Sequence, residues 1–359
     1  MPWKESTRMG ERAEFIALAE QVGSNISQLS ERYGISRKTG HKWIERYRAE
    51  GLAGLGDRSR RPQSSPGQST PEQEEAVLQV RDQYGWGAHK IQVYLAREQG
   101  LVLAKSTVHS ILRRHERVEP AGSRTSGPYQ RFERERPNEL WQMDFKGHFG
   151  LGTGERCHAL TVLDDHSRFS LCLQACRNQR TATVQTQLEA TFRRYGLPER
   201  MLMDNGSPWG NDPEHPHTPL TVWLLRLGIA VSHGRPYHPQ TQGKEERFHR
   251  TLTVEVLAQR VYADFLRMQQ RFDEWRHCYN QVRPHEALGM AVPASRYQMS
   301  PRAFPERLPP LEYGTRDQVR LVQDKGRIIF QGRRFKVGKA FRGYPVAVRS
   351  TSTDGLYDV

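Results

Sequence analysis

Three acidic residues stand where their side chains could bind a metal ion. Asp144 and Asp204 each end a short stretch of strand-forming residues, and Glu246 lies in the first turn of a helix that follows a Pro- and Gly-containing loop. Metal-dependent phosphoryl transfer requires carboxylates that converge from separate elements. Taken alone, Glu246 also fits an ordinary amphipathic helix with an acidic first turn, which the helix dipole favours. The chemistry therefore depends on whether the chain brings all three acids together.

The elements around these acids can bring them to one edge of a sheet. A period of two in the apolar residues predicts strands within 140–145, 157–163 and 169–173, and short apolar runs predict strands at 200–204 and 229–231. Helical spacing predicts helices at 181–195 and 221–227, and a further helix that carries Glu246. An antiparallel three-stranded meander followed by alternating helices and strands would place the three acids in one site. We expect an α/β fold for this region, residues 138–298.

Residues 1–55 have the pattern of a helix-turn-helix DNA-binding domain. We expect a helix over residues 11–22, a short helix capped by Ser27, a turn at Gly34 and a further helix capped by Ser36. The last helix begins with basic and hydroxyl side chains, which suit contacts with phosphates and base edges. An ordinary helical hairpin is the alternative. The expected DNA contacts are Arg37, Lys38, His41 and Lys42.

Two linkers and a second helical unit separate this domain from the central region. Residues 56–70 are rich in Gly, Ser, Pro and Arg, and predict an extended linker able to follow a DNA groove. Residues 71–118 predict a second helix-turn-helix domain, with a capped, basic third helix at 106–115. A merely structural helical domain is the alternative. Residues 119–137 form another linker. The expected DNA contacts in this part of the chain are Arg58, Arg60, Arg61, Ser106, Thr107 and Arg113.

The composition of the 359 residues indicates a polyanionic partner. The excess of Lys and Arg leaves a net charge of +14, which favours nucleic acid, although a basic ribosomal or membrane-surface protein would share it. No apolar stretch is long enough to span a membrane, and the first residues carry no cleavage signal. We expect a cytoplasmic, nucleoid-associated protein with no membrane partner. The four cysteines have neither disulfide nor zinc-ligand spacing, so reduced thiols are expected.

These features resemble the DDE-type insertion-sequence transposases, whose catalytic core is similar to that of retroviral integrases. The resemblance implies an RNase H-like, mixed five-stranded sheet core, preceded by two all-α helix-turn-helix domains and followed by a small β-barrel. The upstream helices resemble the DNA-end-binding helices of that family. The matching segments, within residues 138–290, are Trp141-Gln142-Met143-Asp144, Leu163-Asp164-Asp165-His166-Ser167-Arg168, Asp204-Asn205-Gly206, His238-Pro239-Gln240-Thr241-Gln242-Gly243-Lys244-Glu245-Glu246-Arg247 and Tyr279-Asn280-Gln281-Val282-Arg283-Pro284-His285-Glu286-Ala287-Leu288.

The resemblance implies a transposase that binds the terminal inverted repeats of an insertion sequence and catalyses cleavage and strand transfer of double-stranded DNA. It implies that Asp144, Asp204 and Glu246 are both the catalytic residues and the metal ligands. The family places its acid three residues after the loop glycine, which selects Glu246 over Glu245. Carboxylate oxygens suit Mg²⁺, and we expect two Mg²⁺ ions, with Mn²⁺ as a substitute. Action on two DNA ends implies a homo-oligomer, at least a dimer.

Weaker expectations concern residues close to the acids. Lys244, Arg247 and Arg250 are expected to grip DNA phosphates, although a solvated helix face fits them nearly as well. The role of His249, one turn from Glu246, is left open.

Some polar residues are expected to have no role in the chemistry. Asp164 and Asp165 fit a structural turn and are expected to pair with Arg168. His215 and His217 are expected in a solvated surface loop, because no partner ligands accompany them.

Residues 312–359 predict the small β-barrel, with short strands at 319–322, 327–330, 334–337 and 346–348 and basic turns suited to the DNA backbone. The last six residues resemble the beginning of a further strand, which leaves open whether the barrel is truncated.

Two rival functions share parts of this pattern. A catalytically silent or domesticated helix-turn-helix regulator would keep the DNA-binding units without the chemistry, and the three intact acids argue against it. A plain nuclease would use the same metal ligands but would hydrolyse DNA without recognising its ends.

Overall fold

The computed structural model describes residues 7–58, 68–118, 133–210, 217–234 and 243–359. The chain divides into two compact units, Met1–Gln68 and Ser69–Val359, and each is described by itself. Among the described residues, no helix is both long enough and apolar enough to cross a membrane.

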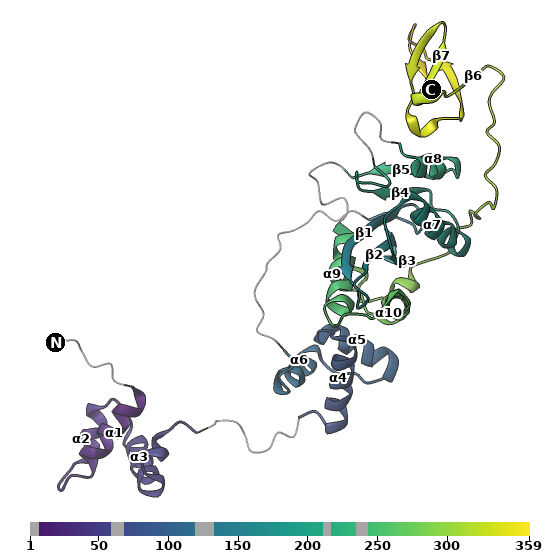
Figure 1. Ribbon diagram of the computed structural model, residues 1–359. Helices are drawn as coiled ribbons and strands as arrows, with labels where there is room; N and C mark the ends of the chain where they lie inside the picture. The colour runs from purple at the N-terminus through teal and green to yellow at the C-terminus, as the bar shows by residue number, and fades with distance from the viewer. Residues whose placement is uncertain (1–6, 59–67, 119–132, 211–216, 235–242) are drawn as a thin grey trace. The chain divides into compact units, whose positions relative to one another are not determined.

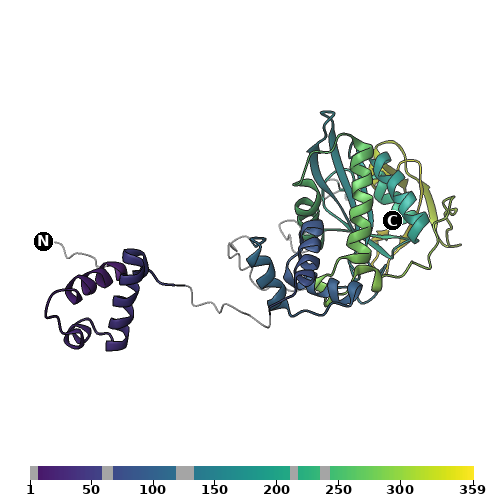
Figure 2. The same ribbon diagram turned by 90° about the horizontal axis from the view of Figure 1, so that it is seen from below.

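The first unit is a bundle of three helices, purple in Figures 1 and 2. Ser36 caps the third helix as expected, because its side chain accepts a backbone N–H. The expected cap at Ser27 is wrong: Asn25 accepts two backbone N–H groups and starts the second helix earlier. The first helix also begins earlier than expected, because Thr7 caps it. The helices are α1 (Arg8–Ala19), α2 (Ile26–Arg32) and α3 (Arg37–Glu50), followed by the 3₁₀ helix η1 (Gly51–Leu55).

The α2 and α3 helices approach closely at Gly40. A Cβ atom on this residue would lie 2.6 Å from Ser30 Oγ and 2.9 Å from Phe15 Cζ, which is closer than non-bonded atoms can approach. The absence of a side chain at Gly40 therefore allows the two helices to pack. The buried apolar residues of this unit are Phe15, Ile16, Trp43, Ile44 and Leu55.

The second unit begins with three more helices, α4 (Pro71–Tyr84), α5 (Ala88–Gln99) and α6 (Lys105–Arg114). The expectation of a capped α6 is wrong, because its N-cap residue is Ala104 and no side chain caps the helix. Later residues pack against the apolar core of these helices, namely Cys278 and Val282. In addition, Arg97 Nη2 donates a hydrogen bond of 2.5 Å to the carbonyl oxygen of Val282. This packing was not expected from the sequence.

The central region contains a mixed five-stranded sheet with the order β3-β2-β1-β4-β5. The first three strands form an antiparallel meander, and β4 and β5 run parallel to β1. This arrangement confirms the expected integrase-like mixed sheet. The strands are β1 (Trp141–Gly150), β2 (Arg156–Asp164), β3 (Ser170–Cys176), β4 (Arg200–Met203) and β5 (Ala230–His233).

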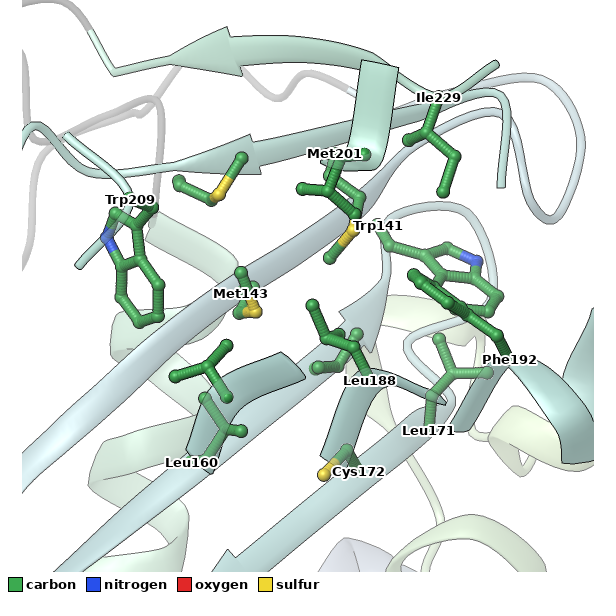
Figure 3. Close-up of a cluster of buried hydrophobic side chains, with 14 of the residues drawn as sticks. Trp141, Met143, Leu160, Leu171, Cys172, Leu188, Phe192, Met201, Trp209 and Ile229 are labelled. Atoms are coloured by element: carbon green, nitrogen blue, oxygen red, sulfur yellow. The ribbon is translucent and has the colours of Figure 1, made fainter. Parts of the chain in front are cut away.

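Helices cover both faces of the sheet (Figure 1). The α7 (Thr181–Tyr195) and α8 (Pro219–Arg226) helices pack on one face, and α9 (Gly243–Leu252) and α10 (Phe265–His277) on the other. Side chains alternate along β1, so Met143 and Phe145 join the cluster under α7 while Asp144 lies on the α9 side. Figure 3 shows this cluster, with Trp209 at one end and Trp141 and Phe192 at the other.

Two π-helical segments, η3 (Thr253–Leu257) and η4 (Cys278–Val282), extend α9 and α10, and the 3₁₀ turns η5 (Glu286–Leu288) and η6 (Pro293–Ser295) follow. The C-terminal strands then form a three-stranded sheet of the order β10-β9-β6 and a separate β7-β8 hairpin. A closed barrel is not confirmed for the described residues. The last strand, β10, pairs with β9. The elements are β6 (Gln318–Leu321), η7 (Asp324–Gly326), β7 (Arg327–Phe330), β8 (Arg333–Lys336), η8 (Lys339–Phe341), β9 (Pro345–Ser350) and β10 (Tyr357–Asp358).

Candidate active site

Asp144 and Asp204 come together because their strands are parallel neighbours. Trp141 of β1 pairs with Met201 of β4, and each acid lies three residues further along its own strand direction. Burial raises the pKa of the Asp144 carboxyl to about 6, and the nearby negative charge of Asp204 adds to that effect. Two carboxylates thus lie within electrostatic reach of each other, in an arrangement that a cation would stabilise.

Each of these carboxylates has one oxygen bound by the protein. Asp144 Oδ1 accepts the backbone N–H of Phe145 at 2.8 Å. Asp204 Oδ1 accepts the backbone N–H of Gly206 at 2.8 Å and the indole N–H of Trp209. Within the described part of the chain, Asp204 Oδ2 receives no hydrogen bond. The fixed Oδ1 atoms restrict how each carboxylate can rotate.

Glu246 lies beside Asp144 at a cavity of about 490 Å³. Its side chain is 66% exposed, and Oε1 lies 3.4 Å from Arg250 Nη2 on the next turn of α9. The same cavity contains two basic side chains, Lys146 and Arg250, close to the acids. Sequence reasoning did not single out Lys146, although its position two residues after Asp144 on a strand places both on the same side unless a bulge intervenes. The lining residues are Asp144, Lys146, Glu246, His249, Arg250, Thr253 and Val254.

Glu245 lies on the side of α9 that faces the sheet. Its side chain is 1% exposed, and Oε2 accepts a hydrogen bond of 3.1 Å from the Thr161 hydroxyl. Burial raises the pKa of Glu245 well above its ordinary value, and the charge of Asp144 raises it further. The other carboxyl oxygen, Oε1, is buried and has no hydrogen-bond partner among the described residues. Adjacent glutamates therefore occupy different environments: Glu245 is packed against the sheet and Glu246 lines the cavity.

Thr161 and His249 connect Glu245 with Asp144. Thr161 stands opposite Asp144 in the β1–β2 pairing, and its hydroxyl lies 2.9 Å from the Asp144 carbonyl oxygen and 2.9 Å from His249 Nε2. His249 Nδ1 lies 3.8 Å from Asp144 Oδ2. Burial lowers the pKa of His249 to about 4, so its imidazole is neutral at pH 7. Sequence reasoning missed Thr161, whose role becomes visible only when the register of β1 and β2 is known.

The oxygen donors fit a hard divalent cation such as Mg²⁺, which is bound by few carboxylates and keeps several waters. However, the described residues contain no group of three His, Cys, Asp or Glu side chains placed to hold one metal ion. The structure therefore brings Asp144 and Asp204 together and places Glu246 at the cavity, without assembling a three-ligand cage.

Lys244 is buried in an ion pair. Its Nζ lies 2.5 Å from Asp165 Oδ1 and 3.1 Å from the Asp165 carbonyl oxygen, and its side chain is 14% exposed. Burial lowers the pKa of Lys244 to about 8, and the positive charge of Arg168 also acts to lower it. Asp165 is fully buried and also accepts the Gln142 amide at 2.7 Å. Lys244 thus attaches the start of α9 to the turn between β2 and β3, a contact that competes with its expected role on DNA.

The turn after β2 is structural, as expected. Asp164 is buried and accepts backbone N–H groups from Ser167 and Asn138. Arg168 pairs with Asp165 as expected, but through the backbone: its Nη1 donates to the Asp165 carbonyl oxygen, and its side chain also forms an ion pair with Glu133. A short turn leaves several acceptors within reach of one guanidinium, and sequence spacing does not choose among them.

The other expected DNA contacts are mostly exposed. The Lys42 Nζ lies over the Trp43 ring, 4.8 Å from the ring centroid. Arg58 forms an ion pair with Glu50. Thr107 is half-buried, and the other described residues of this set are exposed. Arg60 and Arg61 lie outside the described residues. The exposed residues are Arg37, Lys38, His41, Ser106, Arg113, Arg247 and Arg250.

His217 differs from its expected place in a solvated loop. It is half-buried, and its ring meets the edge of Phe341 with 5.3 Å between centroids. Phe341 of the C-terminal segment therefore contacts this histidine, which the local sequence could not indicate. His215 lies outside the described residues.

Comparison with protein families gives matches along most of the chain. Two models described as "Integrase core domain" match residues 134–239 and 227–293. A helix-turn-helix domain matches residues 11–63, and a homeodomain-like domain matches residues 39–112. The IS481 family transposase C-terminal domain matches residues 317–359.

Similar proteins include two insertion-element proteins. The uncharacterized 39.2 kDa protein of insertion element IS476 from Xanthomonas euvesicatoria is 30% identical over 160 residues, which are 44% of each chain. The uncharacterized 31.7 kDa protein of insertion element IS407 from Burkholderia multivorans is 26% identical over 158 residues, 44% of this chain and 54% of that one. The chain thus spans about half the length of these relatives.

Among solved structures, a simian T-cell lymphotropic virus intasome in complex with PP2A regulatory subunit B56 gamma aligns with a TM-score of 0.40 and 15% identity. The alignment covers 78% of this chain and 94% of that one.

Proposed function

We propose that this chain binds the terminal inverted repeats of an insertion sequence and catalyses metal-dependent DNA cleavage and strand transfer. The chain belongs to the insertion-sequence transposases with an integrase-like core. One observation carries this proposal: Asp144 lies within electrostatic reach of Asp204 and lines the same cavity as Glu246. These residues lie in a region that integrase core models match.

The acidic residues have separate tasks in this proposal. The carboxylates of Asp144, Asp204 and Glu246 would hold two Mg²⁺ ions, for which Mn²⁺ could substitute. When bound, the ions would lower the pKa of an attacking water or 3′-hydroxyl and stabilise the leaving oxygen of an in-line displacement. Glu245 would not be a ligand, because its carboxyl is buried against Thr161.

Basic residues at the cavity would hold the DNA backbone next to the acids. Lys146 and Arg250 line the same cavity as Asp144 and Glu246, so a phosphate placed there would meet positive charge close to these carboxylates. His249 is neutral near pH 7 and would orient Asp144 without repelling a cation.

DNA ends would be recognised by the two helical units, residues 1–55 and 71–118, as separate domains. Their exposed basic and hydroxyl residues support this proposal, with α3 and α6 as the helices that enter the groove. The C-terminal segment, residues 312–359, would contact the DNA backbone through its Arg and Lys side chains. Joining two ends would need a homo-oligomer, at least a dimer. Association with the nucleoid would follow from these DNA contacts.

Purified full-length protein should be tested with labelled duplexes from the DNA that flanks its gene. We expect Mg²⁺-dependent cleavage at the element ends and transfer of those ends into a plasmid. Asp144→Asn, Asp204→Asn and Glu246→Gln should each abolish both products, whereas Glu245→Gln, the matched neighbour, should retain them. Retained activity in any of the first three would remove that residue from the site. End binding without products from the wild type would favour the silent regulator, and equal cutting of unrelated DNA would favour the nuclease.

A further inference from the structure

We propose that Trp209 is a positioning residue that orients the Asp204 carboxylate through its indole N–H. This inference rests on the proposed function, because the orientation of the Asp204 carboxylate matters only if that carboxylate binds a metal ion.

Burial, ring stacking and a hydrogen bond fix the position of the Trp209 side chain. Its side chain is 2% exposed, and it closes one end of the buried cluster shown in Figure 3. Its ring stacks on Phe145, with 5.4 Å between centroids and 13° between the ring planes. Stacking fixes the plane of the indole and therefore the direction in which Nε1 donates. That donation goes to Asp204 Oδ1.

The hydrogen bonds of Asp204 are divided unequally between its two oxygens. Oδ1 receives both the Gly206 backbone N–H and the Trp209 indole N–H. In the described residues, no donor reaches Oδ2, which leaves that atom available for a cation. A carboxylate that is hydrogen-bonded on one oxygen cannot turn freely, and such outer contacts raise the affinity of metal sites.

The same aromatic pair also reaches the second acid. Phe145, on which Trp209 stacks, donates its backbone N–H to Asp144 Oδ1 at 2.8 Å. Trp209 therefore contacts the residues that fix both carboxylates, one through a hydrogen bond and the other through packing. Among natural side chains, phenylalanine would preserve much of the packing and would lose the hydrogen bond.

Measuring Mn²⁺ binding to the full chain separates the contribution of the Trp209 hydrogen bond from that of its packing. We expect Trp209→Phe to weaken Mn²⁺ binding, measured by electron paramagnetic resonance titration without DNA, by about 10- to 100-fold. The matched control is Trp275→Phe, because Trp275 is equally buried and donates its indole N–H to Glu255 Oε2 at 2.8 Å in another cluster. This control should leave Mn²⁺ binding unchanged.

The outcomes distinguish the inference from the proposed function. If Asp204→Asn binds Mn²⁺ as well as the wild type, the proposed metal site is wrong. If Asp204→Asn loses binding but Trp209→Phe does not, or if Trp275→Phe loses as much as Trp209→Phe, the role of Trp209 is refuted. Should Trp209→Phe fail to fold, Phe145→Leu serves instead, because it removes the stacked ring and keeps the indole N–H. That variant should also weaken Mn²⁺ binding, because the indole then lacks the ring that fixes its plane, and binding equal to that of the wild type would overturn the proposal.

Discussion

Lys244 Nζ lies 2.5 Å from Asp165 Oδ1, and the two side chains are 14% and 0% exposed, so an almost fully buried ion pair joins the start of α9 to the turn after β2. The next two residues of α9 are Glu245, which packs against the sheet, and Glu246, which lines the cavity. The ion pair therefore helps to set which of the adjacent glutamates faces the cavity.

Replacing Lys244 by Met is expected to lower the free energy of unfolding by about 3 kcal/mol, because the charge of Asp165 would stay buried without its partner. Urea denaturation of the full chain would measure this change. The control is Arg250→Met, which breaks the exposed pair with Glu246 on the same helix and should change stability by no more than about 0.5 kcal/mol. Additive losses in Lys244→Met, Asp165→Asn and their double variant would contradict a direct interaction between the two residues.

The His285 side chain should make stability depend on pH. Its Nε2 lies 3.0 Å from the Tyr279 carbonyl oxygen, and burial, followed by the charge of Arg283, lowers its pKa to about 3. The unfolded chain therefore binds more protons between pH 3 and pH 6.5, so stability is lost as the pH falls through that range. Between pH 7 and pH 5, the loss should be about 2 kcal/mol.

Thermal or urea unfolding at several pH values would check this dependence. His285→Gln should reduce the slope of the profile below pH 6.5 and leave the part that His249, with its pKa of about 4, contributes. His277→Gln should not change the slope, because His277 is exposed. An unchanged slope in His285→Gln would show that another group titrates.

Lys146 should contribute one contact with the DNA backbone. Lys146→Met is expected to weaken binding to all DNA sequences about equally and to reduce the slope of log affinity against log salt by about 1. Fluorescence anisotropy with Ca²⁺ in place of Mg²⁺ would measure binding without turnover. Glu246→Gln, which removes a charge of opposite sign from the same cavity, should not reduce this slope. A slope in Lys146→Met equal to that of the wild type would exclude the contact.

Gly40 should be intolerant of any side chain. Gly40→Ala is expected to destabilise the α2–α3 packing by about 1–3 kcal/mol, since its Cβ would collide with Ser30 and Phe15. Native-state hydrogen exchange of the α3 amides would measure the change. Gly56→Ala is the control, because its Cβ would be 3.4 Å from its nearest neighbour and its φ of −66° suits alanine. Equal protection of α3 in both variants would contradict the close contact.

Much of the fold could be predicted because apolar periodicity records which face of an element is buried. Helix α7 has the expected bounds, strand β4 ends one residue earlier than expected, and the order of the core elements is as expected. Helix starts were less predictable, since Ser27 and Asn25 are both good capping residues and only the path of the chain selects Asn25. Barrel closure was also beyond the sequence, because pairing between distant short strands leaves no local pattern.

Side-chain partners were the least predictable part of the candidate site. Asp144 and Asp204 each end a strand-forming run, which indicated a shared site, and the register of β1 and β4 brings them together. In contrast, the burial of Lys244 depends on Asp165, 79 positions earlier in the chain. Likewise, the contact of Trp209 with Asp204 depends on a stacked ring from another strand. Such contacts arise from tertiary packing and not from spacing along the chain.

Because Trp141 pairs with Met201, the number of residues between each of these positions and its aspartate is more tightly constrained than the length of a loop. Inserting a single residue between Trp141 and Asp144, or between Met201 and Asp204, would turn one carboxylate to the opposite surface of the sheet and separate the two acids. Natural variants of this protein should therefore gain and lose residues in connecting segments far more readily than within the two short runs that precede the aspartates.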